Sequence, residues 1–257
     1  SYQLVNPPAG AAISAGGIIT WTPTESQGPS TNVFTTIVTD NGVPILSATN
    51  DFTVIVSEVN STPSFTATPT NQTIAELTSL IVTNIAADAD VPTNVLTYTL
   101  LGPVTATINT NTGVITWTPG EADGPSTNTF TTIVSDGSAS STNSFNVVVT
   151  EVNQAPVLPA QTNQTIAELA VLTVTNTASD GDLPANNLLY QLINPPSGAS
   201  ISGLGIITWI PTEAQGPSSA TFTTVVSDGI ASATNSFIVN VTETNQAPVL
   251  PVQSNRN

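Results

Sequence analysis

Apolar and polar residues alternate along short stretches of this chain, and turn residues separate the stretches. In the last third of the chain, the alternating stretches cover 171–177, 187–193, 205–210, 220–227 and 235–243. They are rich in β-branched and aromatic residues, which with a period of two is typical of half-buried β-strands. Turn dipeptides such as Asp228-Gly229 lie between them. No stretch keeps a period of 3.6 residues, so the pattern predicts an all-β fold.

The stretch that contains tryptophan recurs along the chain. Segments 17–23, 113–119 and 205–211 read GIITWTP, GVITWTP and GIITWIP. Their tryptophans, Trp21, Trp117 and Trp209, lie 96 and then 92 residues apart. A period of that length indicates one whole domain per copy rather than a solenoid coil. With 163–168 as an opening strand, each copy has about seven strands, which predicts Greek-key β-sandwiches of the immunoglobulin-like type joined end to end.

The copies meet at similar short linkers. Segments 58–63, 151–156 and 243–248 carry Glu, Asn and Pro at matching places. Each proline forces its predecessor into an extended conformation, so about three residues join the last strand of one copy to the first strand of the next. The predicted domains are a partial copy lacking its first strands over 1–60, complete copies over 61–153 and 154–245, and a terminal piece over 246–257.

The terminal piece has two possible interpretations. Residues 248–255 parallel 156–163, so the piece is either the opening strand of a further copy or a donor strand that completes the open sandwich of a neighbouring chain.

The recurrent aromatic residues also have two possible interpretations. Trp209, Phe222 and Phe237 have counterparts in the other copies and are expected to fill the sandwich core. A sugar-stacking platform is the alternative, and it requires several exposed rings on one face.

Composition narrows the partners that the chain can have. Of 257 residues, 39 % are hydrophobic, which is enough for real cores. The net charge is −16 and the only basic residue is Arg256, which argues against nucleic acid and against anionic membrane surfaces. No apolar run is long enough to predict membrane insertion. Cysteine and histidine are absent, which excludes disulfides and disfavours zinc. The composition leans towards an extracellular location on a prokaryotic cell surface.

The acidic residues recur in register with the copies. Fifteen of the seventeen do so, and only Asp51 and Asp123 do not. The recurring positions are Glu25, Asp40 and Glu58 in the first copy, then Glu76, Asp88, Asp90, Glu121, Asp136 and Glu151, and then Glu168, Asp180, Asp182, Glu213, Asp228 and Glu243. Solvated turn residues are the simpler interpretation of any one of these acids. That interpretation does not predict recurrence at all six positions.

Strand order predicts where these acids gather. Alternate strand ends lie at opposite poles of a sandwich, so Asp180, Asp182 and Asp228 are expected at one pole. Glu168, Glu213, Glu243 and Asn245 are expected at the other. The junction between the second and third copies would then combine Glu76, Glu121, Glu151 and Asn153 with Asp180, Asp182, Asn186 and Asp228. Converging carboxylates without lysine or arginine favour Ca²⁺, which takes about 6–8 oxygen ligands.

These motifs resemble the cadherin repeat, and more closely the bacterial cadherin-like or Ig-like tandem repeats of calcium-dependent surface proteins. Residues 205–217 carry Gly-x-x-Thr-Trp-x-Pro-Thr-Glu-Ala-Gln-Gly-Pro, and 151–156 read Glu-Val-Asn-Gln-Ala-Pro. The resemblance implies calcium between successive copies, with an upper site made by Asp88, Asp90, Asn94, Asp136, Glu25, Glu58 and Asn60. Each linker here lacks the second Asp of the family, so the resemblance implies one or two ions per junction.

The sequence therefore predicts an extracellular structural or adhesive protein, a calcium-stiffened rod or filament subunit that associates with itself head to tail. The alternative is an extender module that binds glycans or ice within a larger secreted protein. An enzyme is not expected, because the acids repeat in every copy whereas a catalytic site is usually single. Four sequons, at Asn71, Asn163, Asn240 and Asn60, are candidate glycosylation sites.

Overall fold

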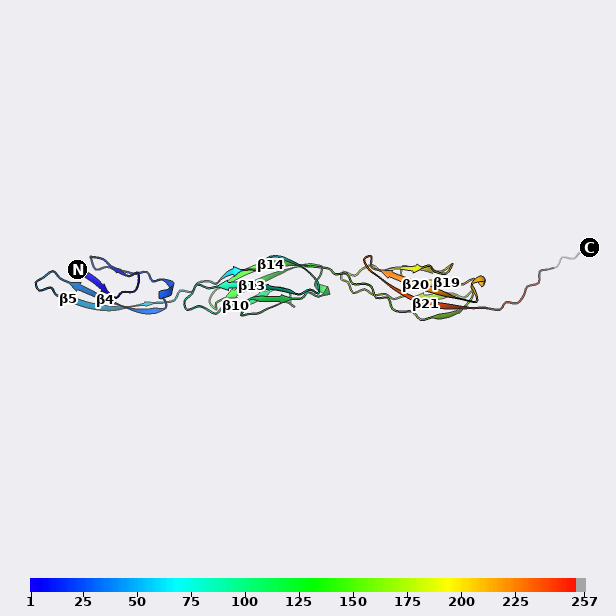
Figure 1. Cartoon of the computed structure of the whole chain (residues 1–257), viewed down its shortest axis with the longest axis horizontal. Coiled ribbons are helices and arrows are strands. Elements are labelled where there is room, and N and C mark those ends of the chain that lie inside the picture. Colours follow the sequence, from blue (N-terminus) through cyan, green and yellow to red (C-terminus); the bar gives the residue numbers. More distant parts are fainter. Residues whose placement is uncertain (253–257) are drawn as a thin grey trace, which may run out of the picture. The chain divides into compact units, whose positions relative to one another are not determined.

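The computed structural model describes residues 1–252 and is almost entirely β-structure (Figure 1). Its strands form three β-sandwiches, and the helices of the described residues are three single 3-10 turns: η1 Glu25–Gln27, η2 Glu121–Asp123 and η3 Glu213–Gln215. The chain divides into two compact units, residues 1–119 with 126–149, and residues 120–125 with 150–257. The predicted fold class, all-β with tandem sandwiches, is confirmed.

The third sandwich, in the second unit, has seven strands. They are β15 Gln164–Ala167, β16 Leu172–Thr175, β17 Leu189–Ile193, β18 Ser200–Ile201, β19 Ile206–Trp209, β20 Ser218–Ser227 and β21 Ser232–Thr242. One sheet has the order β15-β21-β20-β17 and the other β16-β19-β18. β15 runs parallel to β21, with Gln164 opposite Val239, whereas the other pairs are antiparallel. The sequence pattern predicted all of these strands except the two-residue β18.

The second sandwich, in the first unit, repeats this plan and adds a short pair. Its strands are β6 Ser64–Ala67, β7 Gln72–Ala75, β8 Leu80–Thr83, β9 Ile85–Ala87, β10 Thr97–Leu101, β11 Thr107–Ile108, β12 Val114–Trp117, β13 Ser126–Ser135 and β14 Ser140–Thr150. The sheets have the orders β10-β13-β14-β7 and β11-β12-β8, and β6 pairs with β9. The strands β7 and β8 close one edge of each main sheet.

The first sandwich, also in the first unit, is open where the other two are closed. It contains β1 Tyr2–Val5, β2 Ala12–Ile13, β3 Ile19–Thr20, β4 Ser30–Thr39 and β5 Ser47–Val56. Its sheets are β1-β4-β5 and β2-β3, so residues 1–60 supply no counterpart of β7 or β8.

Aromatic side chains fill the cores of the complete sandwiches, as the sequence predicted. In the third sandwich, Trp209 is 2 % exposed and its ring lies 5.3 Å from that of Phe222, which in turn stacks on Phe237 at 5.4 Å. The second sandwich buries its equivalent rings in the same way. In the first sandwich Phe34 is buried, but Phe52 is 40 % exposed because no strand covers it. The tryptophans of the complete copies are therefore unavailable for stacking on sugars.

Residues 246–252 are exposed and form no strand in this structure. The remainder of the predicted terminal piece, including Arg256, lies outside the described residues. Its interpretation as an opening or donor strand stays a prediction. No helix in the described part of the chain has the length and apolar character needed to cross a membrane.

Candidate metal centre

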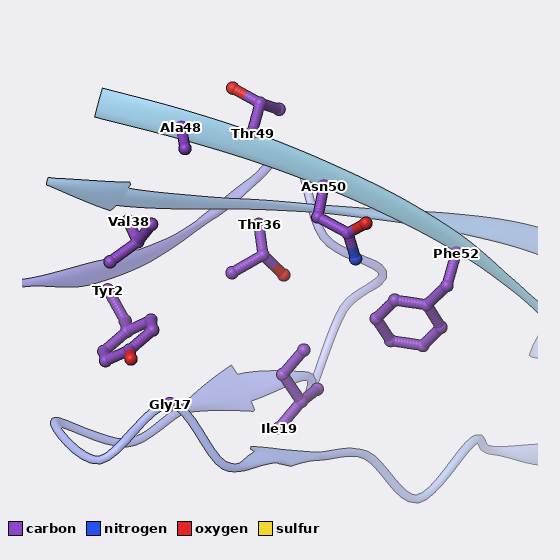
Figure 2. A pocket seen from close by; sticks show the side chains of 9 residues that line it. All are labelled: Tyr2, Gly17, Ile19, Thr36, Val38, Ala48, Thr49, Asn50 and Phe52. Atoms are coloured by element: carbon purple, nitrogen blue, oxygen red, sulfur yellow. The ribbon is translucent and has the colours of Figure 1, made fainter. Parts of the chain in front are cut away.

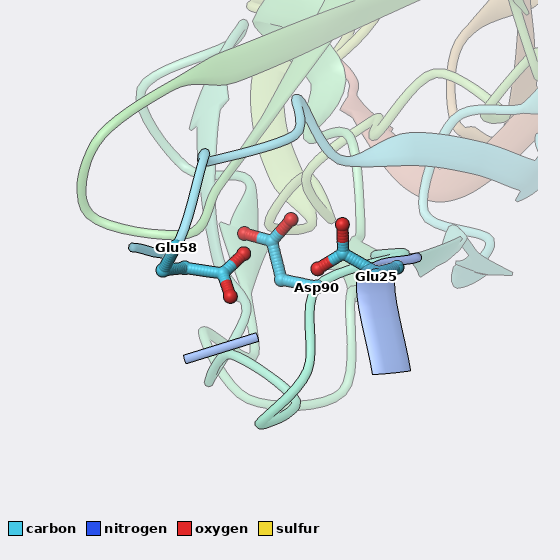
Figure 3. Close-up of side chains that lie close together, drawn as sticks. All are labelled: Glu25, Glu58 and Asp90. Atoms are coloured by element: carbon cyan, nitrogen blue, oxygen red, sulfur yellow. The ribbon is translucent and has the colours of Figure 1, made fainter. Parts of the chain in front are cut away.

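Three carboxylates of the first unit come together where the first two copies meet (Figure 3). Glu25 lies in η1, Glu58 follows β5, and Asp90 follows β9. One oxygen atom from each lies within 4.8 Å of the others. Asp90 is buried, whereas Glu25 and Glu58 are exposed. We call these residues the first glutamate cluster.

Asp90 also belongs to a second group, with Asp88 and Asp136, whose oxygen atoms lie within the same 4.8 Å limit. We call it the first aspartate cluster. The two clusters together bring five of the acids predicted for this junction to one place. At an effective dielectric constant of about 20, two like charges about 5 Å apart repel by roughly 3 kcal/mol. No lysine or arginine lies among the described residues to offset that repulsion.

Backbone amides hold the aspartates in position. Asp136 Oδ1 accepts hydrogen bonds from the Ser138 and Ala139 amides at 2.6 and 2.7 Å, as expected for an Asp-Gly turn. These bonds lower the pKa of the Asp136 carboxyl, with Ala139 the largest cause. Asp90 Oδ1 accepts from the Ser61 amide at 2.8 Å, which ties the linker to the second sandwich.

The amide nitrogens of two predicted asparagine ligands donate hydrogen bonds to the aspartates. Asn60 Nδ2 lies 3.0 Å from Asp136 Oδ2, and Asn94 Nδ2 lies 2.7 Å from Asp90 Oδ2. Each asparagine therefore orients a carboxylate through its amide nitrogen.

The pKa of Glu58 is shifted in the opposite direction. Partial removal from water raises the pKa of the Glu58 carboxyl, and the adjacent Glu25 raises it further. Both effects disfavour the charged form of Glu58 relative to a glutamate in water.

The second unit contains the same aspartate arrangement. Asp180, Asp182 and Asp228 form the second aspartate cluster within the same distance limit, as the strand order predicted. The hydrogen bonds also repeat, and join Gln154 N to Asp182 Oδ1, Asn186 Nδ2 to Asp182 Oδ2 and Asn153 Nδ2 to Asp228 Oδ2. Glu121 Oε1 accepts from the Leu183 amide at 3.0 Å, as Glu25 Oε1 does from Val91 at 3.3 Å. Recurrence of the individual bonds shows that the motif encodes one local geometry.

A further group of glutamates forms at the other pole of the third sandwich. Glu168, Glu213 and Glu243 have carboxylate oxygens within 4.8 Å of one another, and we call them the last glutamate cluster. Burial raises the pKa of the Glu243 carboxyl, and the charge of Glu168 adds to this. Asn245, which was predicted to join them, is exposed. Glu76 and Glu151 occupy the corresponding places after β7 and β14, where Glu76 is buried.

Glu168 shows how the fold directs a carboxylate inwards. It is 3 % exposed, and Oε1 accepts from the Thr244 amide at 2.8 Å. Its other oxygen, Oε2, is buried and has no hydrogen-bond donor among the described residues. Gly216 lies directly against that oxygen, so a methyl group at this position would collide with it. The next residue, Leu169, takes a φ of 60°, a conformation that costs a side-chain-bearing residue free energy.

The same buried, donor-free oxygen occurs in both aspartate clusters, at Asp88 Oδ2 and Asp180 Oδ2. A buried charged oxygen without a donor is unfavourable unless a cation or proton compensates it. The side chains gathered in these clusters are carboxylates, with asparagine amides beside them, and their oxygen atoms are the hard ligands that Ca²⁺ prefers. The residues therefore fit calcium, and zinc is disfavoured because histidine and cysteine are absent.

Two linker glutamines form hydrogen bonds with glutamates of the motif, which the sequence analysis did not predict. Gln154 Nε2 donates to Glu121 Oε2 at 2.7 Å, and Gln246 Nε2 donates to Glu213 Oε2 at 3.0 Å. The first linker has Ser61 at this position, which is too short to make the bond. A glutamine that recurs in two linkers beside the glutamate motif was the available signal.

One acid outside the repeat pattern also has a local explanation. Asp123 Oδ2 accepts from the Gly120 amide at 2.8 Å, at the start of η2. Gln27 and Gln215 make the equivalent bonds in the other copies, at 2.9 and 2.8 Å. Asp123 therefore replaces a turn-capping glutamine and needs no role in binding a cation.

The sequons lie in different environments. Asn71 Oδ1 accepts from the Asn146 amide, and Asn163 Oδ1 accepts from the Ile238 amide, both at 2.8 Å. Asn240 Oδ1 accepts from Ser219 Oγ at 2.7 Å, and Asn60 Nδ2 donates to both Ser61 O and Asp136 Oδ2. A sugar on Asn60 Nδ2 would compete with those two bonds. Glycosylation at these sites stays a prediction.

Comparison with known proteins places this architecture in a structural class. Mouse Cadherin-23 EC22-24 has a TM-score of 0.51 and 21 % identity, with 95 % of this chain and 86 % of that chain covered. PcdhgB3 EC1-4 has a TM-score of 0.54 and 16 % identity, with coverages of 95 % and 67 %. No family model and no curated protein sequence matches the chain. The chain is thus a tandem array of β-sandwiches with the cadherin-type fold.

Proposed function

We propose that this chain is an extracellular structural or adhesive repeat protein whose carboxylate clusters bind Ca²⁺. The observation that carries the proposal is the pair of clusters that share Asp90, drawn from two consecutive copies. The resemblance of the acid motifs to calcium-dependent surface repeats supports it, as does the cadherin-type fold.

The protein's own residues would provide all the chemistry that such a site needs. Bound calcium supplies positive charge that offsets the repulsion between carboxylates. Asp90 accepts a hydrogen bond from the Ser61 amide, and its carboxylate lies close to those of Glu25 and Glu58. Asp90 therefore connects the linker and the first copy to the second copy. With the repulsion offset, these contacts stabilise the linker and restrict motion between the two copies. No catalytic role is proposed.

Self-association completes the proposal. A prokaryotic cell surface is the proposed location, and a head-to-tail array or filament of stiffened copies is the proposed assembly. The repetition of the acid motif in every copy supports an architecture that extends by adding copies.

A calcium titration tests the proposal. We expect Ca²⁺ to bind with a Kd of about 10⁻⁴–10⁻³ M, as in other extracellular modules. At 100 times the Kd, one bound ion stabilises the folded protein by about 2.7 kcal/mol, which thermal unfolding with and without EDTA would report. Asp90→Asn should weaken binding most, because Asp90 belongs to two clusters. Asp51→Asn is the matched control, since Asp51 lies in β5 outside every cluster.

Two results would contradict the proposal. One is an unfolding temperature that EDTA leaves unchanged. The other is a loss of calcium affinity in Asp51→Asn as large as that in Asp90→Asn.

A further inference from the structure

Each sandwich carries a threonine and an asparagine opposite each other on the inner side of its long hairpin. In the second sandwich they are Thr132 in β13 and Asn143 in β14, two positions from the paired rings of Phe130 and Phe145. The equivalent pairs are Thr36 with Asn50 and Thr224 with Asn235. Threonine and asparagine are mostly surface residues, so a pair placed between two sheets needs hydrogen-bond partners there.

The pair of the first sandwich shows where these side chains point (Figure 2). Thr36 and Asn50 both line one pocket, together with Tyr2, Gly17 and Phe52. Thr36 is half-buried and Asn50 is exposed. Water can therefore reach both polar groups of this pair.

In the second sandwich the corresponding side chains are enclosed. Thr132 is 0 % exposed, and Asn143 is half-buried. Asn84, which lies between β8 and β9, is also 0 % exposed. Its backbone amide and its Nδ2 both donate to Gly113 O, at 3.0 and 3.4 Å. These bonds fix the Asn84 side chain, and its Oδ1 is left to be satisfied by another group.

The third sandwich shows that the three side chains meet. Asn176 occupies the position of Asn84 and makes the same two bonds, to Gly205 O at 2.9 and 3.1 Å. Asn235 Nδ2 lies 3.4 Å from Asn176 Oδ1, and Thr224 stands opposite Asn235 in the hairpin. A threonine and an asparagine of one sheet therefore lie beside an asparagine that follows an edge strand of the other sheet.

In the second sandwich this place gathers three buried polar atoms without a hydrogen-bond partner among the described residues. They are Asn84 Oδ1, Thr132 Oγ1 and Asn143 Nδ2. An unpaired buried polar atom is costly, so three at one place point to a bound ligand.

The chemistry of these three atoms selects the ligand. Asn143 Nδ2 is a donor, Asn84 Oδ1 is an acceptor, and the Thr132 hydroxyl can act as either. A cation would be repelled by the Asn143 amino group, and an anion would be repelled by the Asn84 carbonyl oxygen. A small neutral molecule that both donates and accepts satisfies all three, and water is the smallest such molecule.

We propose that this layer of the second sandwich is a binding site for one internal water molecule. The water would accept a hydrogen bond from Asn143 Nδ2 and donate to Asn84 Oδ1 and Thr132 Oγ1, and three bonds are typical of a buried water. Asn84 follows β8 in one sheet, and the other two residues lie in the opposite sheet. The water would thus join the two sheets. None of the three residues belongs to a carboxylate cluster, so the site is independent of calcium.

In the third sandwich the protein fills part of the equivalent site itself. Gln161 Nε2 donates to Asn176 Oδ1 at 3.3 Å, whereas the second sandwich has Pro69 at that position. Only Thr224 Oγ1 and Asn235 Oδ1 are left there as buried atoms without a partner among the described residues. A water molecule in the third sandwich would have two side-chain partners instead of three, so we expect it to be held less strongly.

A crystal structure of the chain, at a resolution that shows ordered water, tests the site directly. We expect one fully occupied water within about 3.2 Å of Asn84 Oδ1, Thr132 Oγ1 and Asn143 Nδ2, the usual limit for such bonds. Direct bonds among these three side chains, with no electron density between them, would overturn the proposal.

Thr132→Val tests the site through the sign of its effect on stability, because valine keeps the shape of threonine and lacks the hydroxyl. With water bound, the variant loses one hydrogen bond, so the unfolding equilibrium constant of the second sandwich should rise about 2–10-fold. Without water, the variant removes an unpaired hydroxyl and the constant should fall, which would contradict the proposal. Urea unfolding followed by hydrogen exchange within each sandwich measures the change.

Two further variants serve as matched controls. Thr127→Val makes the same change at an exposed position of β13 and should leave the constant nearly unchanged. Thr224→Val, in the third sandwich, should raise the constant less than Thr132→Val does. A rise in Thr127→Val as large as that in Thr132→Val would assign the effect to the strand and refute the water site.

Discussion

The first and third sandwiches hold the same three aromatic rings in nearly the same arrangement but bury them differently. Trp21 lies 5.4 Å from Phe34, and Trp209 lies 5.3 Å from Phe222. Yet Phe52 is 40 % exposed, whereas Phe237 is 2 % exposed. The long hairpin sets the ring geometry, because Phe34 stands opposite Phe52 as Phe222 stands opposite Phe237. The covering strands β15 and β16 then remove the rings from water.

Truncating the equivalent rings Phe52 and Phe237 should have the largest effect and should separate the contribution of the hairpin to stability from that of the covering strands. Phe237→Ala should destabilise the third sandwich by about 3–5 kcal/mol, the usual cost of deleting a buried aromatic side chain. Phe52→Ala should cost about half as much or less, because water already reaches its ring. Urea unfolding followed by hydrogen exchange within each sandwich measures both. Equal costs would show that the hairpin alone carries the packing energy.

Substitutions at the equivalent glycines Gly17 and Gly205 should give the next largest difference in stability. Gly205→Ala should cost about 2–4 kcal/mol, since its φ of 77° strains any other residue and the new Cβ would come 2.7 Å from Asn176 O. Gly17→Ala has the same strain without a described backbone oxygen in that place, so about 1–2 kcal/mol is expected. Exchange protection in β3 and β19 reports the difference. An equal loss at the two positions would mean that strain alone matters.

A pH titration without calcium compares the first and last glutamate clusters. Loss of hydration and neighbouring carboxylates raise the pKa of Glu58 and of Glu243 above 4.5. A raised carboxyl pKa means that the folded state binds protons more tightly than the unfolded state. This contribution is therefore complete below about pH 4.5 and is lost as the pH rises through the raised pKa values. Unfolding temperatures between pH 4 and 8 should fall modestly, and calcium should reverse the fall at pH 7. A rise without calcium would contradict the assignment.

Substitutions at the equivalent linker positions Ser61 and Gln246 should give the smallest difference in stability. Gln246→Ser makes the last glutamate cluster resemble the first, and Ser61→Gln makes the reverse change. We expect each to shift stability by about 0.5–1 kcal/mol, because the bonds lie at the surface. Gln246→Ser should increase the stabilisation gained from calcium, since Glu213 loses a donor. Differential scanning calorimetry with and without calcium checks both variants, and shifts of the same sign would refute the role of the glutamine.

Much of the fold could be predicted because two simple patterns coincide. The alternation of apolar and polar residues predicted the strands, and the recurring Trp segment predicted the number of copies. Strand order then brought Asp180 and Asp182 together with Asp228 from two separate loops. Their assembly needed only the rule that alternate strand ends share a pole.

The atomic roles could not be predicted in this way. Asn94 and Asn186 are predicted as oxygen ligands, and the structure adds that the Nδ2 of each donates a hydrogen bond to an aspartate, which the sequence did not show. Gln246 was missed because its reach to Glu213 depends on the conformation of the linker.

The parallel pairing of β15 with β21 has a mechanical consequence. The chain enters β15 at Gln164 and leaves β21 at Thr242, so a pull on the two ends of this sandwich slides these strands past each other. The force then acts on all the hydrogen bonds between β15 and β21 at once, instead of breaking them one after another. A sandwich pulled in this way resists tension through shear between β15 and β21.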